Sequence, residues 1–353
     1  MSGPLSLARP DLRDFVPYEA AAPDRQMIRL HANESAWRHP WDDSEAGLNR
    51  YPDPRAERLT RRLAEIYGAR ANELLLTRGS DDAIDVLARA FCVAMQDRVL
   101  VCPPSFGMYA IAARLQGAGV IEVPLDAGRD FSLDEEKLLA AAADVKIVFL
   151  CSPNNPTGNV IPAETIAKIC DRLTDRALVV VDEAYAEFAG APSAIDLRPY
   201  HDNLVILRTL SKAYALAGAR LGVLVADPVV VRLLRGVLPP YPLPSPCLEA
   251  AERLMAPEAL EQARHAVADS VARRRRLADA LTGLSCVTRV WPSEGNFVLV
   301  RFRDADLAVE SCRKRGVLLR DFSRKPGLEG CVRITVGEED ENRLVLETLE
   351  TLQ

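Results

Sequence analysis

The chain has 353 residues, of which 48% are hydrophobic and 27% are charged, and its formal net charge is −6. This composition is typical of a soluble globular protein and excludes a disordered or low-complexity chain. The acidic balance does not favour a nucleic acid or an anionic membrane surface as a partner. At roughly 150 residues per domain, the length predicts two domains.

No apolar run approaches the roughly 20 residues that a membrane helix needs, and the N-terminal segment lacks the apolar core of a signal peptide. We therefore expect no membrane association and a cytoplasmic location. The eight cysteines form no CxxC pair and most lie inside apolar runs, which indicates buried, reduced thiols. The four histidines lack metal-ligand spacing, so we expect no metal site.

From about residue 70 to residue 226, short apolar runs alternate with helical patterns. Six runs predict buried strands, at 74–77, 99–102, 146–151, 177–182, 204–208 and 221–226. Helices are predicted at 81–95, from a capping box at 132–135 to about 143, and from 162 to about 173. Strands that are apolar on both faces suit a parallel sheet covered by helices. This alternation predicts an α/β domain with right-handed crossovers.

A proline-rich stretch at 239–246 is the clearest linker signal of the chain. The pattern beyond it predicts helices at 257–282, 304–315 and 339–352 and strands at 297–302, 317–320 and 332–336. The arginine run at 273–276 is interpreted as a solvated helix face. We predict an N-terminal arm with the start of the small domain at 1–45, a large α/β domain at 46–246 and a small α+β domain at 247–353.

The segment after the strand at 204–208 carries a lysine and an arginine among small hydroxyl residues. Thr209 and Ser211 precede Lys212, and Arg220 follows eight residues later. A phosphate cup that contains a nucleophilic amine fits this pattern, and so does an ordinary surface loop with two cations. The strand-to-helix junction at 77–82 is a second place where free backbone N–H groups would favour a phosphate.

Two further strand ends carry polar side chains. Asp182 ends an apolar strand, where open α/β sheets bind ligands, and a buried carboxylate needs a partner. A protonated pyridine nitrogen would be such a partner, although the residue also fits a helix cap. Asn155 follows the strand at 146–151. It is either a turn-forming residue or a ligand-binding residue whose amide is directed toward a phenolic oxygen. Together the four segments predict pyridoxal 5′-phosphate as the cofactor.

The same segments resemble a known family. The runs CSPNNPTG at 151–158, VVVDEAY at 179–185 and RTLSKAYALAGARLG at 208–222 resemble the fold-type-I aminotransferases. More narrowly, the whole chain resembles the histidinol-phosphate aminotransferase family. The motifs that carry this narrower resemblance are HANE at 31–34, NRYP at 49–52, PPSFGMY at 103–109, LRD at 319–321 and RITVG at 333–337.

The resemblance implies roles for particular residues. Lys212 would form the internal aldimine and then act as general base and acid. Asp182 would pair with the pyridinium nitrogen, and Tyr185 and Asn155 would hydrogen-bond the ring 3′-oxygen. Phe106 would stack on the ring; the family often has Tyr there, so a hydroxyl is lost and stacking is kept. The cofactor phosphate would be held by Gly79, Ser80, Asp81, Thr209, Ser211 and Arg220.

The resemblance also implies a homodimer with shared active sites, because Tyr51 would reach the cofactor phosphate of the neighbouring subunit. Arg320 and Arg333, helped by Tyr18 and Asn33, would bind the anionic groups of the substrate, and Tyr51 and Asn155 would border it. Two arginines suit a site that accepts both a phosphate monoester and the carboxylates of glutamate.

The implied reaction is amino transfer between L-histidinol phosphate and 2-oxoglutarate, a step of histidine biosynthesis. An aromatic amino acid aminotransferase and a threonine-phosphate decarboxylase of the same fold remain as alternatives. A pyridoxal-phosphate-binding regulator is not favoured, because only about 30 residues precede the HANE motif and we expect no added DNA-binding domain. A nicotinamide dehydrogenase is not favoured either, because no G-x-G-x-x-G follows the first strand.

Overall fold

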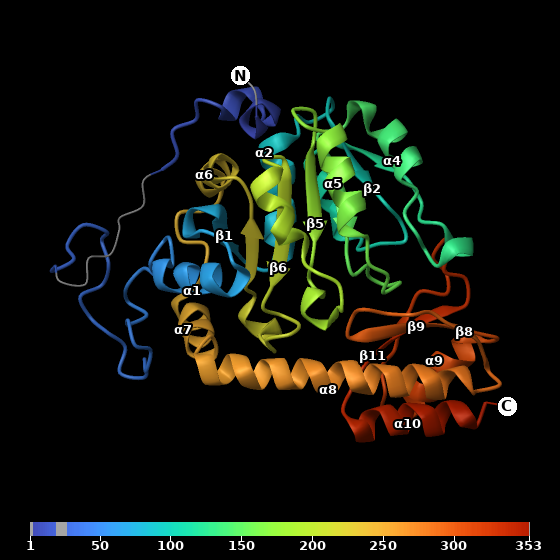
Figure 1. The fold of residues 1–353 in the computed structure, drawn as a ribbon. Helices are drawn as coiled ribbons and strands as arrows, with labels where there is room; N and C mark the ends of the chain where they lie inside the picture. The colour runs from blue at the N-terminus through green and yellow to red at the C-terminus, as the bar shows by residue number, and fades with distance from the viewer. Residues whose placement is uncertain (1–2, 19–26, 353) are drawn as a thin grey trace.

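The computed structural model describes residues 3–18 and 27–352, which form two sheets of different size (Figure 1). The larger sheet has the strand order β1-β7-β6-β5-β4-β2-β3. Its strands are β1 Leu74–Thr77, β2 Arg98–Val101, β3 Gly119–Glu122, β4 Ile147–Cys151, β5 Leu178–Asp182, β6 Leu204–Thr209 and β7 Gly222–Val225. From β3 to β6 all neighbours are parallel, whereas β7 is antiparallel to both β6 and β1. The predicted mostly parallel sheet is confirmed.

The reversal at β7 has a local cause in the chain between Thr209 and Gly222. A parallel return needs a crossover connection, usually an α-helix, and this stretch holds only a 3-10 turn, Ala217–Ala219. The chain therefore turns back and pairs Thr209 with Gly222. As a result, the loop that carries Lys212 stays at the end of β6.

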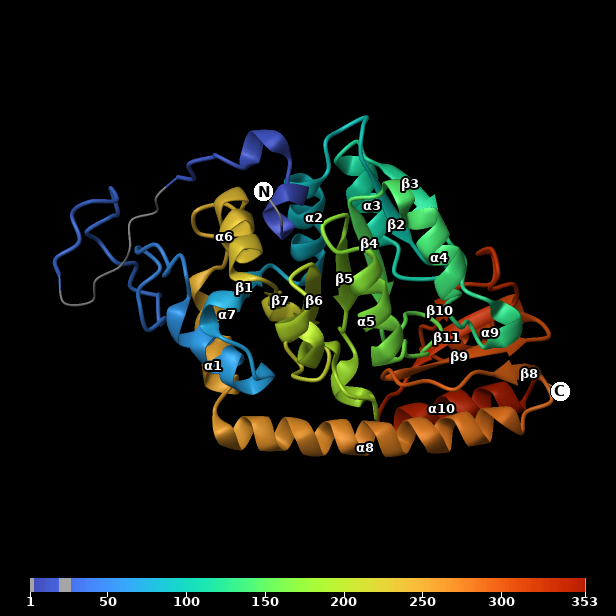
Figure 2. The same ribbon diagram turned by 45° about the horizontal axis from the view of Figure 1, so that its top comes forward.

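Helices cover both faces of the larger sheet (Figure 2). They are α1 Glu57–Tyr67, α2 Ser80–Phe91, α3 Met108–Leu115, α4 Glu135–Ala141, α5 Ala163–Arg172, α6 Pro228–Val237 and α7 Ser245–Leu254. α2, α3 and α6 share one core with strand residues such as Phe149 and Val180. The other core contains Leu150 and Val181, the residues that follow Phe149 and Val180 in the chain. It is covered by α1, α4, α5 and α7. Because successive strand side chains point to opposite faces, a strand covered on both faces is apolar throughout.

The smaller sheet is antiparallel, with the order β10-β11-β9-β8. Its strands are β8 Val287–Val290, β9 Phe297–Phe302, β10 Arg320–Asp321 and β11 Cys331–Thr335, and its helices are α9 Ala305–Lys314 and α10 Glu339–Glu350. The long helix α8 Pro257–Thr282 packs against β8, β9 and α10 and also against the 3-10 turn Ala186–Phe188, which follows β5. α8 therefore connects the two sheets and runs beneath both (Figure 1).

Some predicted elements differ from the observed ones. The edge strand β3 was not predicted, because only its middle residues are partly buried and its apolar run is short. The predicted strand at 317–320 is reduced to Arg320–Asp321. The capping box at 132–135 is wrong: α4 begins two residues later, and Asp134 is its cap, accepting from the backbone N–H of Lys137 at 3.1 Å.

The cysteines are all free; seven are buried and Cys247 is half-buried, so the prediction of buried thiols holds for all but one. No helix in the described ranges is both long and apolar enough to cross a membrane. Within those ranges, no group of three or more His, Cys, Asp or Glu side chains is placed to hold a metal ion.

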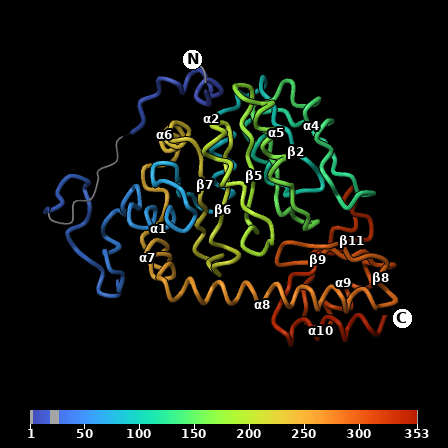
Figure 3. Tube along the Cα trace, viewed as in Figure 1, coloured from blue at the N-terminus to red at the C-terminus, as the bar shows by residue number. Residues whose placement is uncertain are grey.

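The segment from residue 27 to about 50 extends away from the rest of the molecule (Figure 3). The proline-rich stretch lies between α6 and α7, and α7 packs against α1 beside the larger sheet. The division of the chain at 45/46 and 246/247 stays a prediction.

Candidate active site

The loops that follow four strands of the larger sheet meet at one edge. The carboxyl ends of parallel strands lie at the same edge of a sheet. β4 leads to Asn155, β5 ends at Asp182, and β6 leads to Lys212. β1 runs parallel to these strands because two antiparallel pairings separate it from β6, and it leads to Ser80 at the start of α2. The fold therefore brings together the four segments that the sequence singled out.

Two glycines make the close approach at the start of α2 possible. Gly79 has a φ of +79°, and a Cβ there would lie 2.6 Å from Nη2 of Arg220. A Cβ on Gly222 would lie 2.3 Å from the carbonyl carbon of Gly79 and 2.6 Å from the backbone nitrogen of Ser80. Arg220 also forms an ion pair with Asp81 at 3.3 Å. A helix N-terminus, an arginine and two bare glycines make a cradle of the kind that phosphates occupy.

The hydroxyl residues before Lys212 order its loop. The Thr209 hydroxyl donates to the Ser211 hydroxyl at 2.9 Å and accepts from the Ser211 backbone N–H at 3.1 Å. Thr209 is buried, whereas Ser211 is partly exposed. Of the two, Ser211 is therefore the better placed to meet a phosphate.

The amine of Lys212 lies 5.9 Å from the centre of the Tyr185 ring. Partial burial, followed by the positive charges of Arg333 and Arg220, lowers the pKa of Lys212 from its ordinary value. Burial of Tyr185 raises the pKa of its phenol, so this hydroxyl stays protonated at neutral pH. A neutral amine can act as a nucleophile and base, which an ammonium cannot do.

Asp182 is a buried carboxyl, 2% exposed. Its Oδ2 accepts from the Tyr109 hydroxyl at 2.7 Å, and its Oδ1 accepts from the Ala184 backbone N–H at 3.1 Å. Burial raises the pKa of Asp182 to about 6, although the two hydrogen bonds lower it. The group is thus poised to become fully ionised when a cation is placed beside it.

A buried ion-pair network joins the loop after β5 to the end of β6. Arg208 donates to Glu183 and to Glu187, at 2.7 Å each. Glu183 directly follows Asp182, and Arg208 lies four residues before Lys212. Because breaking a buried pair leaves an uncompensated charge, this network holds the loop after β5 against the end of β6.

The smaller sheet contributes two arginines. Arg333 on β11 and Arg320 on β10 are paired in register. Nη1 of Arg333 donates to Oδ1 of Asn155, which joins the smaller sheet to the loop after β4. Phe322 lies under both guanidinium groups, at 5.6 Å from Arg320 and 5.8 Å from Arg333. Burial lowers the pKa of Arg333, but a guanidinium remains charged at neutral pH.

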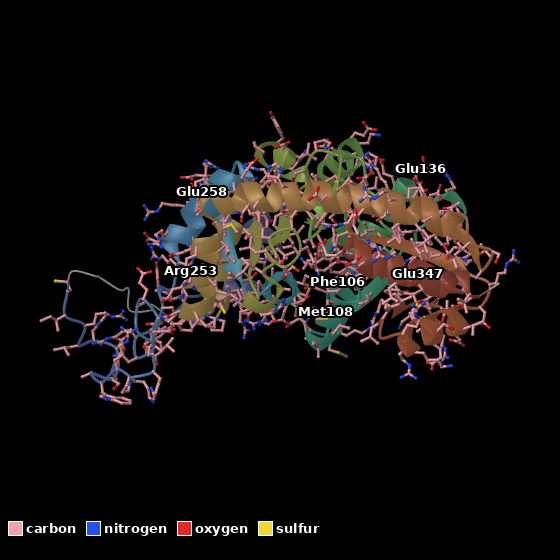
Figure 4. The ribbon with its side chains drawn as sticks, turned by 90° about the horizontal axis from the view of Figure 1, so that it is seen from below. Phe106, Met108, Glu136, Arg253, Glu258 and Glu347 are labelled. Carbon is pink, nitrogen blue, oxygen red and sulfur yellow. The ribbon has the colours of Figure 1, made fainter. Side chains whose placement is uncertain are left out.

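Phe106 lies in the segment between β2 and α3, with its ring edge-on to that of Tyr109 at 5.7 Å. Seen from below, Phe106 lies near the middle of the molecule (Figure 4). The stacking role of Phe106 stays a prediction.

Three predicted site residues are not brought to this edge. Tyr18 is 75% exposed, Tyr51 is 49% exposed and Asn33 is also exposed. Tyr51 stacks on Tyr241 with ring centres 4.4 Å apart. Within the described part of this single chain, none of the three hydrogen-bonds to a residue of the sheet edge. Arg320 is exposed as well.

A cavity of about 620 Å³ lies elsewhere, between α8, α1 and the loops at 187–190 and 213–214. None of the predicted site residues lines it. The polar residues at the sheet edge therefore form a separate site.

Three residues outside the predicted set contribute to the site. Gly222 closes the cradle, Tyr109 contacts Asp182, and Phe322 contacts both arginines. Tyr109 lies in the PPSFGMY run, but the family resemblance that this run carries implied no role for Tyr109. No sequence pattern around Gly222 or Phe322 indicated a role in the site.

The fold and this site define a class of protein. The chain matches the family of class I and II aminotransferases over residues 28–349 and belongs to it. The predicted aminotransferase, its fold-type-I architecture and its dependence on pyridoxal 5′-phosphate are confirmed.

Within this family, the chain is similar to histidinol-phosphate aminotransferases. The histidinol-phosphate aminotransferase of Xanthomonas euvesicatoria pv. vesicatoria is 46% identical over 99% of this chain and 97% of its own length. The crystal structure of histidinol-phosphate aminotransferase from Sinorhizobium meliloti in complex with pyridoxal-5′-phosphate has a TM-score of 0.76 and 26% identity, and the alignment covers 86% of this chain and 84% of that one.

A third comparison concerns the decarboxylase alternative. The crystal structure of L-threonine-O-3-phosphate decarboxylase from Porphyromonas gingivalis has a TM-score of 0.71 and 26% identity, over 86% of this chain and 91% of that one. Structural likeness therefore does not separate the two activities. The full-length sequence relatives, which carry the aminotransferase name, favour transamination.

Proposed function

We propose that the enzyme transfers an amino group between L-histidinol phosphate and 2-oxoglutarate, forming imidazole-acetol phosphate and L-glutamate. The observation that carries this proposal is the contact of Arg333 with Asn155. It places an anion-binding guanidinium beside a residue that would hold the cofactor. Arg320, its partner in register, offers a second cation for a substrate that bears a phosphate.

The residues at the sheet edge fit pyridoxal 5′-phosphate. The cradle that a Cβ on Gly79 or Gly222 would fill suits its phosphate, with donors from Ser80, the Asp81 backbone and Ser211. Arg220 adds a positive charge, and Thr209 orders the loop. When bound, this cofactor supplies an aldehyde that captures amino groups and a ring that accepts electrons from the substrate Cα.

Four side chains would orient the ring. The carboxylate of Asp182 would pair with the ring nitrogen, and Phe106 would pack on the ring face. Oδ1 of Asn155 accepts from Arg333, so its Nδ2 is directed elsewhere and would donate to the ring 3′-oxygen, as would the Tyr185 hydroxyl.

Lys212 would carry the proton transfers. Its Nζ would take the proton from Cα of the amino donor and later return a proton to Cα of the new amino acid. The lowered pKa of Lys212 leaves a larger share of the amine neutral, and therefore basic, at neutral pH.

The substrate would be held by its anionic groups. Nε of Arg333 is buried and has no hydrogen-bond partner among the described residues, so it has a donor to offer to a carboxylate or phosphate oxygen. Arg320 would meet the second anionic group. Tyr18 and Asn33 would add polar contacts at the outer end of the substrate.

We also propose a cytoplasmic homodimer in which Tyr51 reaches the cofactor phosphate of the neighbouring subunit. The extended N-terminal segment exposes large apolar side chains, namely Met27, Ile28, Leu30, Trp37 and Trp41, each at least 63% exposed. Apolar surface gathered in this way is typical of an interface. Eight free cysteines suit a reducing compartment.

Steady-state turnover of L-histidinol phosphate with 2-oxoglutarate tests the proposal. Arg333→Lys keeps the charge but loses the planar fork, and we expect a rise of at least tenfold in KM for histidinol phosphate. Arg324→Lys, at an exposed position, is the matched control. Robust turnover of phenylalanine with none of histidinol phosphate would refute the substrate assignment.

A further inference from the structure

Tyr109 is a buried residue that makes a direct hydrogen bond to the carboxyl expected to face the cofactor ring. It lies in the first turn of α3 and is 1% exposed. Its hydroxyl donates to Oδ2 of Asp182 at 2.7 Å. None of the roles assigned to the predicted site residues accounts for this contact.

Two aromatic neighbours fix the position of this hydroxyl. The Tyr109 ring stacks on Phe149 of β4, with centres 5.0 Å apart and planes 5° apart. It is edge-on to Phe106 at 81°. A ring held on its face and its edge has little freedom to move, so the position of the hydroxyl oxygen is set before any ligand binds.

The surroundings of Asp182 otherwise favour its neutral form. Burial is the largest influence and raises the pKa, and the carboxylates of Asp81 on α2 and Glu183 on the same loop raise it further. The hydrogen bonds from the Tyr109 hydroxyl and the Ala184 backbone N–H lower it. The other titratable groups near Asp182 are Cys151, Tyr185 and Lys212.

We propose that Tyr109 is a positioning residue that keeps Asp182 ionised and turned toward the ring nitrogen of the cofactor. The proposal rests on the proposed role of Asp182. A carboxylate that is already ionised and oriented can meet a pyridinium at once. A neutral carboxylic acid would leave the ring nitrogen without a counter-charge and weaken the ring as an electron acceptor.

The first test uses the protein without cofactor. Tyr109→Phe removes the hydroxyl and keeps the ring stacking, and Tyr67→Phe removes a phenol hydroxyl from the core on the other face of the sheet. Carbon-13 NMR of labelled aspartate carboxyls, with Asp182→Asn for assignment, measures the titration of Asp182. We expect its pKa to rise by about one to two units in Tyr109→Phe, as loss of a hydrogen bond to a charged group predicts, and to stay unchanged in Tyr67→Phe.

The second test measures cofactor binding by equilibrium dialysis of the cofactor-free protein. We expect the Kd for pyridoxal 5′-phosphate in Tyr109→Phe to rise about tenfold at pH 7 relative to the unsubstituted protein. The ratio should fall toward one at pH 9, where Asp182 ionises without help. In an Asp182→Asn background, Tyr109→Phe should have no further effect.

An unshifted Asp182 titration overturns the proposal, and so does a shifted titration with unchanged cofactor affinity. A loss of affinity that is the same at every pH, or that persists in the Asp182→Asn background, shows a merely structural role and also overturns it. Failure of the proposed function would appear differently, as absent turnover of histidinol phosphate by the unsubstituted enzyme.

Discussion

Replacing Gly222 with alanine should disrupt the cradle that is expected to hold the cofactor phosphate. The added Cβ would lie 2.3 Å from the carbonyl carbon of Gly79, 2.6 Å from its oxygen and 2.6 Å from the backbone nitrogen of Ser80. Carbon atoms pack best at about 3.5–4.0 Å, so the overlap exceeds about 1 Å. All three contacts are backbone atoms, and no side-chain rotation can relieve them.

The free energy of unfolding should fall by about 2–3 kcal/mol, at the upper end of what overpacking costs. Relief of the overlap requires β1 and β7 to separate at the pair Thr77 and Gly222, which moves the start of α2. We therefore expect the affinity for pyridoxal 5′-phosphate to fall at least tenfold.

Urea denaturation and equilibrium dialysis with the cofactor measure the two effects. Gly218→Ala is the matched control in the same connection, because a Cβ there meets no atom within 4 Å. If Gly222→Ala had both an unchanged denaturation midpoint and an unchanged cofactor affinity, the cradle would not be built as described.

Other substitutions test separate parts of the account. Lys212→Ala should abolish transamination and the visible absorbance of the bound cofactor while the fold persists; near-normal turnover would contradict the role of Lys212. Asp182→Asn should stabilise the cofactor-free protein by roughly 2 kcal/mol at pH 8 but not at pH 4. The pKa of Asp182 is raised to about 6 in the folded protein. Its contribution to stability is therefore fully present below the pKa of the unfolded state and is lost as the pH rises through 6. The uncharged Asn side chain does not suffer this loss. Urea unfolding at the two pH values checks this, and equal effects at both would refute the burial argument. Mixing inactive Tyr51 and Lys212 variants should restore part of the activity through hybrid dimers, and no recovery under conditions of subunit exchange would contradict a shared site.

The predicted site segments share a property that sequence alone reveals. Asn155, Asp182 and Lys212 each follow an apolar strand, and the carboxyl ends of parallel strands meet at one edge whatever the strand order. Their proximity could therefore be predicted without knowing the topology. The strands β4 and β5 could be predicted because both of their faces are buried and apolar. The edge strand β3 was not predicted because its residues are exposed or only partly buried.

What the sequence could not reveal depends on register and on packing between distant elements. The role of Gly222 follows from its pairing with Thr77 on a strand far away in the sequence. Tyr109 reaches Asp182 only because α3 packs against the face of the sheet that includes Phe149. Among the described residues of a single chain, Tyr51 makes no hydrogen bond to the sheet edge, so the role proposed for it requires a second subunit.

The most direct measurement is a screen of amino donors in single half-reactions, read from the absorbance of the bound cofactor. L-histidinol phosphate, L-phenylalanine and threonine phosphate would be compared, with release of carbon dioxide followed in parallel. The account predicts rapid loss of the aldehyde-form absorbance with histidinol phosphate and no carbon dioxide. A faster reaction with phenylalanine, or carbon dioxide released from threonine phosphate, would contradict it.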